Sequence, residues 1–231
     1  MAENALIVGA GSGLSASLAR LFAAEGMALA LAARRTDKLR DLCAETGAAA
    51  FACDAAEPDQ VATLFAEVEG RLGPLDVVVY NPSYRVRGPL VEVDPAEVTR
   101  TLAVSAFGGF LVGQAAARSM LKRGGGGAIL FTGASASVRG YARSAPFAMG
   151  KFALRGLAQS MARELAPEGI HVAHFVIDGG IGAAGRPTPP DRQPDSMLDP
   201  DAIARTYLHV LRQDRSAWTW EVELRPWVER F

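Results

Sequence analysis

Three glycines, Gly9, Gly11 and Gly13, lie between a short apolar run and a stretch in which apolar residues recur at helical spacing. The run Ala5–Val8 predicts a strand, and Leu14–Glu25 predicts a helix. Glycine allows a ligand to approach the backbone closely, and the free N–H groups and positive dipole at a helix start attract an anion. This order of strand, glycine turn and helix predicts a site for the pyrophosphate of a dinucleotide.

Arg34 and Arg35 end the second predicted strand, and no acidic residue follows until Asp37. Sites of this type that bind NAD hold the ribose hydroxyls with an acidic residue near this point. A guanidinium instead matches the geometry of a 2′-phosphate and stacks on adenine. We therefore expect NADP(H) in preference to NAD(H), with Arg34 as a contact. The alternative is a solvated basic cluster that opens a helix.

Composition narrows the class of protein. The chain has 231 residues and a formal net charge of −1, which gives no electrostatic reason to expect nucleic acid or an anionic membrane as a partner. Two cysteines, Cys43 and Cys53, cannot form a disulfide framework or a metal site alone. The N-terminus lacks the pattern of a secretion signal, and no apolar run is long enough to cross a bilayer. A reduced, cytoplasmic setting and no metal are expected.

Apolar runs without alternation predict strands buried on both faces of a sheet. We expect strands at Ala5–Val8, Met27–Ala32, Ala48–Cys53, Leu75–Tyr80, Ala128–Phe131, Ile170–Ile177 and Trp218–Leu224. Amphipathic stretches predict helices at Ser15–Glu25, Asp37–Thr46, Pro58–Leu72, Pro95–Arg123, Pro146–Ala166 and Pro200–Gln213. This alternation predicts a single doubly wound α/β domain of Rossmann type over residues 1–231, with a parallel sheet and helices on both faces. Ligands in such folds bind beyond the carboxyl ends of the strands.

With these motifs in order, the whole chain resembles the short-chain dehydrogenase/reductase family. The glycine turn matches that family's Thr-Gly-x-x-x-Gly-x-Gly motif, with Val8 for the threonine and Ser15 for the last glycine. Asp54, Asn81 and Lys151 stand where the family has its adenine-contacting aspartate, the asparagine after strand four and the active-site lysine. The resemblance implies an oxidoreductase that uses NAD(P)(H) to interconvert a carbonyl and an alcohol on a small substrate.

The catalytic set departs from the family pattern. The family has a tyrosine, which acts as general acid and base, four residues before the lysine, and this chain has Phe147 there. A phenylalanine ring neither donates nor accepts a proton. The family serine that orients the carbonyl falls on Ala134, with Ser135 adjacent, and the family's helix asparagine falls on Ser105. We therefore expect an atypical member of the family, in which Ser135 polarises the carbonyl.

The candidate residues follow from the motifs and the resemblance together. The predicted catalytic residues are Lys151, Ser135, Tyr84 and Tyr141. The predicted cofactor-binding residues are Gly9, Gly11, Ser12, Gly13, Leu14, Arg34, Asp54, Asn81, Lys151 and Gly179.

Three explanations of the missing tyrosine stay open. The protein is a reductase with another acid, for which Tyr84 and Tyr141 are the nearest candidates, although each also fits a tyrosine packed at a loop edge. It is a slow enzyme to which water or the substrate supplies the proton. Or it binds the dinucleotide without catalysis, as a sensor or assembly partner.

Two further segments bear on partners and substrate. The helices Thr101–Met120 and Phe147–Leu165 are more apolar than one sheet face requires, and the resemblance implies a homodimer or homotetramer. Residues 179–200 are rich in proline and are predicted to form a mobile substrate lid. Arg139, Arg143 and Arg186 are compatible with an anionic substrate, although surface arginines are common.

Overall fold

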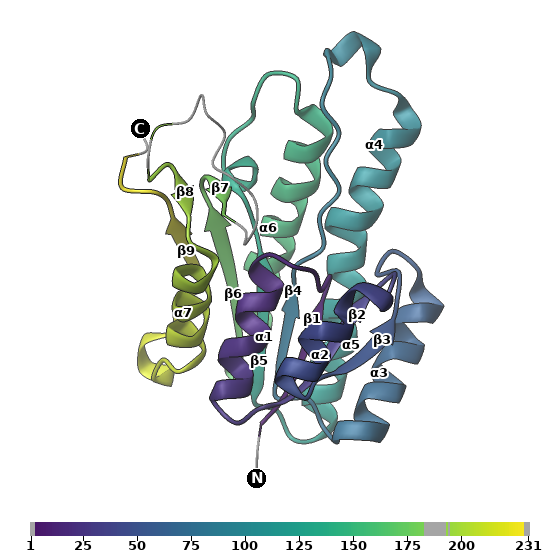
Figure 1. Ribbon diagram of the computed structural model, residues 1–231, viewed down its shortest axis with the longest axis vertical. Coiled ribbons are helices and arrows are strands. Elements are labelled where there is room, and N and C mark those ends of the chain that lie inside the picture. The colour runs from purple at the N-terminus through teal and green to yellow at the C-terminus, as the bar shows by residue number, and fades with distance from the viewer. Residues whose placement is uncertain (1–2, 183–192, 194, 229–231) are drawn as a thin grey trace.

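The computed structural model describes residues 3–182, 193 and 195–228. At its centre is a seven-stranded sheet of order β3-β2-β1-β4-β5-β6-β9, in which every neighbouring pair is parallel (Figure 1). The strands are β1 (Asn4–Val8), β2 (Ala28–Ala33), β3 (Ala49–Ala52), β4 (Val77–Tyr80), β5 (Gly127–Thr132), β6 (Ile170–Ile177) and β9 (Glu221–Leu224). The order reverses between β1 and β4, which confirms the predicted doubly wound Rossmann-type α/β fold.

Helices cover both faces of this sheet (Figure 1). They are α1 (Leu14–Ala24), α2 (Arg40–Thr46), α3 (Pro58–Leu72), α4 (Pro95–Leu102), α5 (Gly108–Lys122), α6 (Ala145–Leu165) and α7 (Pro200–Leu211). Apolar residues of α1, α2 and α7 form one core with the sheet, and those of α3, α5 and α6 form another on its opposite face. The central strands are therefore buried on both faces of the sheet, which explains their continuous apolar sequences.

The helix predicted over residues 95–123 is interrupted, which corrects the sequence-based boundary. A π-helical segment, Ala103–Phe107, separates α4 from α5. Tyr80 lies beneath it, and its hydroxyl donates a hydrogen bond to the Val104 carbonyl. A Cβ on Gly108 would lie 2.5 Å from the Tyr80 hydroxyl. The wider turn therefore frees a carbonyl for a buried phenol, an interaction that helical periodicity does not reveal.

Two other boundaries also differ from prediction. Short strands β7 (Gly180–Ile181) and β8 (Met197–Leu198) pair in parallel within the segment predicted as a lid loop. Residues 183–192 and 194 of that segment lie outside the described residues. The last strand of the sheet begins at Glu221 and not at Trp218, and the Trp218 ring stacks on His171 with 4.5 Å between ring centroids. No helix in the described ranges combines the length and apolar character needed to cross a membrane.

Candidate active site

The glycine turn lies at the carboxyl end of β1, where the chain enters α1. Gly9 has φ of 81°, and a Cβ there would lie 2.6 Å from the Pro82 backbone nitrogen, so only glycine fits without displacement. A Cβ on Gly11 or Gly13 would meet no atom within 4 Å. The N–H groups of residues 11–13 form no hydrogen bond with any described residue, and no side chain caps α1. Free donors at an uncapped helix start form a cradle for an anion.

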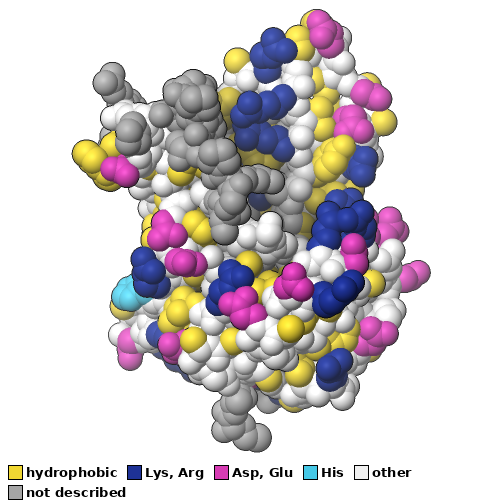
Figure 2. Space-filling model, in the orientation of Figure 1, with side chains coloured by type: hydrophobic (Ala, Val, Ile, Leu, Met, Phe, Trp, Pro, Cys, Tyr) yellow, Lys and Arg dark blue, Asp and Glu magenta, His cyan; other side chains and the backbone are white. Residues whose placement is uncertain are grey.

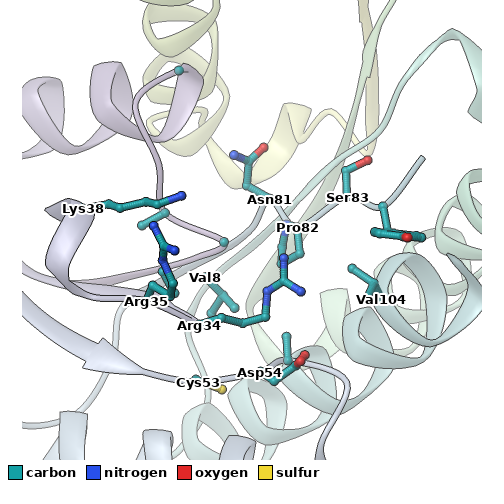
Figure 3. Close-up of a pocket in the computed structure, with 16 residues that line it drawn as sticks. Val8, Arg34, Arg35, Lys38, Cys53, Asp54, Asn81, Pro82, Ser83 and Val104 are labelled. Carbon is teal, nitrogen blue, oxygen red and sulfur yellow. The ribbon is translucent and has the colours of Figure 1, made fainter. Parts of the chain in front are cut away.

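A cavity of about 970 Å³ opens beside this turn (Figure 3). Arg34 and Arg35, from the end of β2, and Lys38, from the turn that follows, line it together with Asp54. Arg35 forms an exposed ion pair with Asp37, at 3.6 Å. Arg34 has no ion pair or hydrogen bond with any described residue, so its guanidinium is available to a ligand.

Asn81 connects the glycine turn with the loop after β4. Its Nδ2 donates a hydrogen bond to Ser15 Oγ at 2.6 Å, and the Ser15 hydroxyl donates to the Gly9 carbonyl at 3.1 Å. These bonds join the start of α1 to the ends of β1 and β4. Asn81 and Ser83 line both this cavity and a second one of about 650 Å³, so the two cavities adjoin along the carboxyl edge of the sheet.

Lys151 stands in the second cavity, on the second turn of α6. Its side chain is 2% exposed, and Nζ donates a hydrogen bond of 2.9 Å to the Thr132 carbonyl at the end of β5. Burial lowers the pKa of this amine from 10.5 to about 8, because the charged form loses its hydration. The amine is therefore poised to change its charge in the neutral to mildly alkaline range.

Phe147 lies one helical turn before Lys151 and faces the same cavity. Its ring centroid is 6.0 Å from Lys151 Nζ and 4.9 Å from Arg85 Cζ. Arg85 comes from the loop after β4, four residues beyond Asn81. Two cations thus approach an aromatic ring that carries no hydroxyl, an arrangement favoured by the negative face of the ring.

The two candidate tyrosines lie in different places. Tyr84 lines the first cavity, and its hydroxyl donates a 2.6 Å hydrogen bond to Glu97 Oε2, which raises the pKa of the phenol. Tyr141 lines the second cavity together with Lys151 and Ser135. Only Tyr141 therefore shares a cavity with the lysine.

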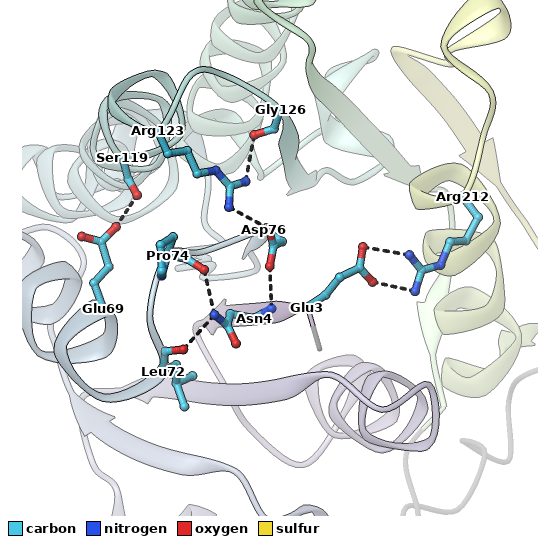
Figure 4. A network of polar contacts seen from close by, with 10 residues as sticks. All are labelled: Glu3, Asn4, Glu69, Leu72, Pro74, Asp76, Ser119, Arg123, Gly126 and Arg212. Carbon is cyan, nitrogen blue, oxygen red and sulfur yellow. Dashed lines mark hydrogen bonds and ion pairs between the residues drawn. The ribbon is translucent and has the colours of Figure 1, made fainter. Parts of the chain in front are cut away.

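The opposite edge of the sheet contains polar groups that bind one another (Figure 4). Asn4 donates its backbone N–H to Asp76 at 2.8 Å, and the same carboxylate pairs with Arg123 at 2.7 Å. Arg212 pairs with Glu3 at 2.7 Å. These groups satisfy each other and fix the starts of β1 and β4. The unpaired donors of the glycine turn, by contrast, lie at the carboxyl edge.

Residues 3–183 match the family model of the short chain dehydrogenases. The chain belongs to the short-chain dehydrogenase family. It is 35% identical to a short-chain dehydrogenase of Rhodopseudomonas palustris, whose structure superimposes with a TM-score of 0.82 and a coverage of 97% of this chain and 99% of that one. It is 31% identical over 182 residues to sorbitol dehydrogenase of Cereibacter sphaeroides, a match to 77% of this chain and 71% of that protein. An alcohol dehydrogenase of Thermococcus sibiricus, solved with 5-hydroxy-NADP, is 26% identical with a TM-score of 0.86, covering 100% of this chain and 99% of that one. The match to the family model therefore assigns the chain to a family of oxidoreductases.

In this short-chain dehydrogenase, the structure brings most of the sequence-predicted site residues to one edge of the sheet. The first cavity is lined by Gly9, Gly13, Arg34, Asp54, Asn81 and Tyr84, and the second by Asn81, Ser135, Tyr141, Lys151 and Gly179. Gly11 and Ser12 belong to the turn beside the first cavity, whereas the side chain of Leu14 is buried in the core.

Sequence reasoning missed two groups at the second cavity. Arg85 and Arg87 follow the segment Asn81–Tyr84 directly, and the available signal in the sequence was two arginines that alternate with Val86 beside a predicted site segment. A partly buried polar network near Lys151, outside the lining of the cavity, was also missed: Glu221 on β9 accepts hydrogen bonds from Arg155 at 2.6 Å and from His174 at 3.0 Å. Burial lowers the pKa of His174 to about 4, so the imidazole is neutral near pH 7.

Proposed function

We propose that this protein is an NADP(H)-dependent oxidoreductase that interconverts a carbonyl and an alcohol on a small substrate, with a non-standard catalytic set. One observation carries the proposal. Two adjoining cavities run from the uncapped start of α1 to the buried Lys151, and the first of them is lined by Arg34, which has no ion pair with any described residue. The length and donor pattern suit an extended dinucleotide whose reactive ring lies near Lys151.

The residues present fit such a cofactor. The free N–H groups of residues 11–13 suit a pyrophosphate, and the absence of side chains on Gly11 and Gly13 leaves room for it. Asp54 suits the adenine, and Lys151 suits the ribose next to the nicotinamide. A bound nicotinamide supplies or accepts a hydride at the carbonyl carbon.

Selectivity for NADP(H) rests on Arg34. Its guanidinium is unpaired among the described residues, and it stands directly after β2, where sites that bind NAD have an acidic residue that holds the ribose hydroxyls. We test this by titrating NADPH and NADH against purified protein and following the nicotinamide fluorescence. NADPH should bind more tightly, and Arg34→Ser should weaken NADPH binding by about ten- to a hundredfold while leaving NADH binding unchanged. Absence of binding by either dinucleotide would refute the proposal.

Tyr141 is our candidate for the proton donor, and Ser135 for the group that polarises the carbonyl. An alkoxide formed by hydride transfer needs a proton, and a phenol donates poorly at neutral pH unless a cation stabilises its anion. Tyr141 shares its cavity with Lys151 and has Arg139 at 6.0 Å from its ring. Ser135 begins a short 3-10 helix at the mouth of the same cavity.

The alternative function is a dinucleotide-binding protein without catalysis, which acts as a sensor or assembly partner. The observation that favours it is Phe147, which lies four residues before Lys151 in the same cavity and has no group that could donate or accept a proton. Phe147→Tyr separates the two functions. If the wild type has no activity on a panel of ketones and the variant gains it, the silent function is supported.

We also propose that the protein forms a homodimer or homotetramer through α5, α6 and the π-helical segment. Exposed apolar side chains gather on these elements, namely Phe107, Phe110, Leu121, Met149 and Phe152. The Phe107 and Phe110 rings stack on each other with 6.4 Å between their centroids. Light scattering after size exclusion should give a multiple of the 24.3 kDa chain mass. Phe110→Asp should reduce that mass.

A further inference from the structure

A second group of arginines lines the cavity that holds Lys151, separate from those of the cofactor cavity. Arg85 and Arg87 belong to the loop after β4, and Arg143 to the loop after β5. The Gly88 N–H donates a 3.1 Å hydrogen bond to the Arg143 carbonyl, which holds the two loops together. Figure 2 shows Lys and Arg side chains on the rim of the hollow in this face of the molecule. Three arginines therefore line one cavity.

No described carboxylate neutralises this group. Asp178 is the one acidic residue among the described residues that line the cavity, and it pairs with Arg139 and Arg225. Arg85, Arg87 and Arg143 form no ion pair or side-chain hydrogen bond with any described residue. Arg87 and burial both disfavour the charge on Arg85 and lower its pKa, burial more strongly. Like charges collected without counter-charges create a positive potential that an anion relieves.

Arg85 also lies close to Phe147, which precedes Lys151 by one helical turn. Its Cζ is 4.9 Å from the centroid of the Phe147 ring, and the same ring lies 6.0 Å from Lys151 Nζ. Arg143 has φ of 60°, which is uncommon for a residue other than glycine. An anionic group held by these guanidiniums would place an attached carbonyl near Lys151. The pyrophosphate of a cofactor does not match this group of arginines, because the glycine turn that suits a pyrophosphate opens into the other cavity.

We propose that the substrate of this protein is a carbonyl or alcohol compound that carries a carboxylate or a phosphate, and that Arg85, Arg87 and Arg143 bind this anionic group. The inference rests on the proposed function, whose site it extends. Arginine suits both anions because its planar fork forms two parallel hydrogen bonds with either.

The test compares matched substrates that differ in charge. Protein saturated with NADPH is assayed with acetoacetate against methyl acetoacetate, and with dihydroxyacetone phosphate against dihydroxyacetone. The anionic member of at least one pair should have a kcat/KM about tenfold or more above its neutral partner. The first pair reports on carboxylate and the second on phosphate. Arg85→Gln and Arg143→Gln should each remove about ten- to a hundredfold of that preference, and Arg71→Gln, an exposed arginine on α3, should keep it.

A binding measurement without NADPH makes the result independent of turnover. Malonate and neutral malonamide are titrated calorimetrically into the free protein and into its Arg85→Gln and Arg34→Ser variants. Malonate binding that is lost in Arg85→Gln and kept in Arg34→Ser supports the anion site, even if NADPH fails to bind and the proposed function falls. The inference is overturned if neutral and anionic substrates react equally, or if no substrate reacts and malonate binding is absent or insensitive to Arg85→Gln.

Discussion

The two adjoining cavities differ in which parts of the chain form them. The cavity beside the glycine turn is the cofactor end of the site, and the cavity that holds Lys151 is the reaction end. At the cofactor end, the glycine turn presents backbone N–H groups, and its glycines leave space for a ligand. Hydrogen bonds from Asn81 to Ser15 and from Ser15 to the Gly9 carbonyl hold the turn in place. At the reaction end, the chemistry depends on single side chains, and the ring of Phe147 lies near both Lys151 and Arg85. Backbone donors are fixed by the fold, whereas a catalytic group is exchanged by one substitution. Dinucleotide binding can therefore be retained while the acid moves or disappears.

The largest expected effect concerns the reaction end. Tyr141→Phe should lower kcat by about 10²- to 10⁴-fold, because it removes the proposed proton donor. Tyr84→Phe is the matched control, since it removes the same group from the cofactor cavity, and its kcat at saturating NADPH should stay near the wild-type value. Steady-state oxidation of NADPH measures both. Equal losses in the two variants would contradict the assignment of Tyr141.

The second prediction tests the cofactor end. Gly9→Ala should weaken NADPH binding by more than about tenfold, because the new Cβ meets Pro82 and the left-handed backbone costs a non-glycine residue about 1–2 kcal/mol. Gly156→Ala on α6, where a Cβ meets no atom, is the control and should bind NADPH normally. Fluorescence titration measures both. Unchanged binding in Gly9→Ala would show that the turn adapts.

The third prediction concerns the pH dependence of stability. The pKa of Lys151 is lowered from 10.5 to about 8 by burial, so between these pH values the unfolded chain binds a proton that the folded protein does not. The unfolding free energy of the wild type should therefore rise with pH across this window, by at most ~3 kcal/mol relative to Lys151→Met. Urea unfolding at several pH values measures it. Parallel curves for the two proteins would contradict the shifted pKa.

The smallest expected effect lies behind the reaction end. Glu221→Gln should lower the unfolding free energy by about 2 kcal/mol, since it weakens hydrogen bonds from Arg155 and His174. Glu223→Gln on the same strand is the control, and we expect a loss below about 1 kcal/mol because Glu223 is more exposed. Thermal unfolding of both variants gives the comparison. A larger loss in Glu223→Gln would show that the hydrogen bonds of Glu221 contribute little to the unfolding free energy.

The sequence by itself determined the fold class, and it predicted a dinucleotide turn at the end of β1. Continuous apolar runs such as Val77–Tyr80 follow from burial on both faces, and the spacing of Gly9, Gly11 and Gly13 follows from backbone approach to an anion. The start of α4 at Pro95 also agrees with the predicted boundary, and the side chain of Asp94 caps it by accepting a hydrogen bond from the Ala96 N–H, which is a local interaction. These signals lie within a few residues of each other along the chain.

Only the tertiary structure decided which side chains meet. Tyr84 and Tyr141 were equal candidates in the sequence, but the fold places them in different cavities. The Arg85 guanidinium, on the loop after β4, lies over the ring of Phe147, which is 62 residues later in α6, and the Tyr80 hydroxyl donates to a carbonyl of the π-helical segment. Such contacts depend on how strands and loops are arranged in space, and local periodicity carries no information about that arrangement.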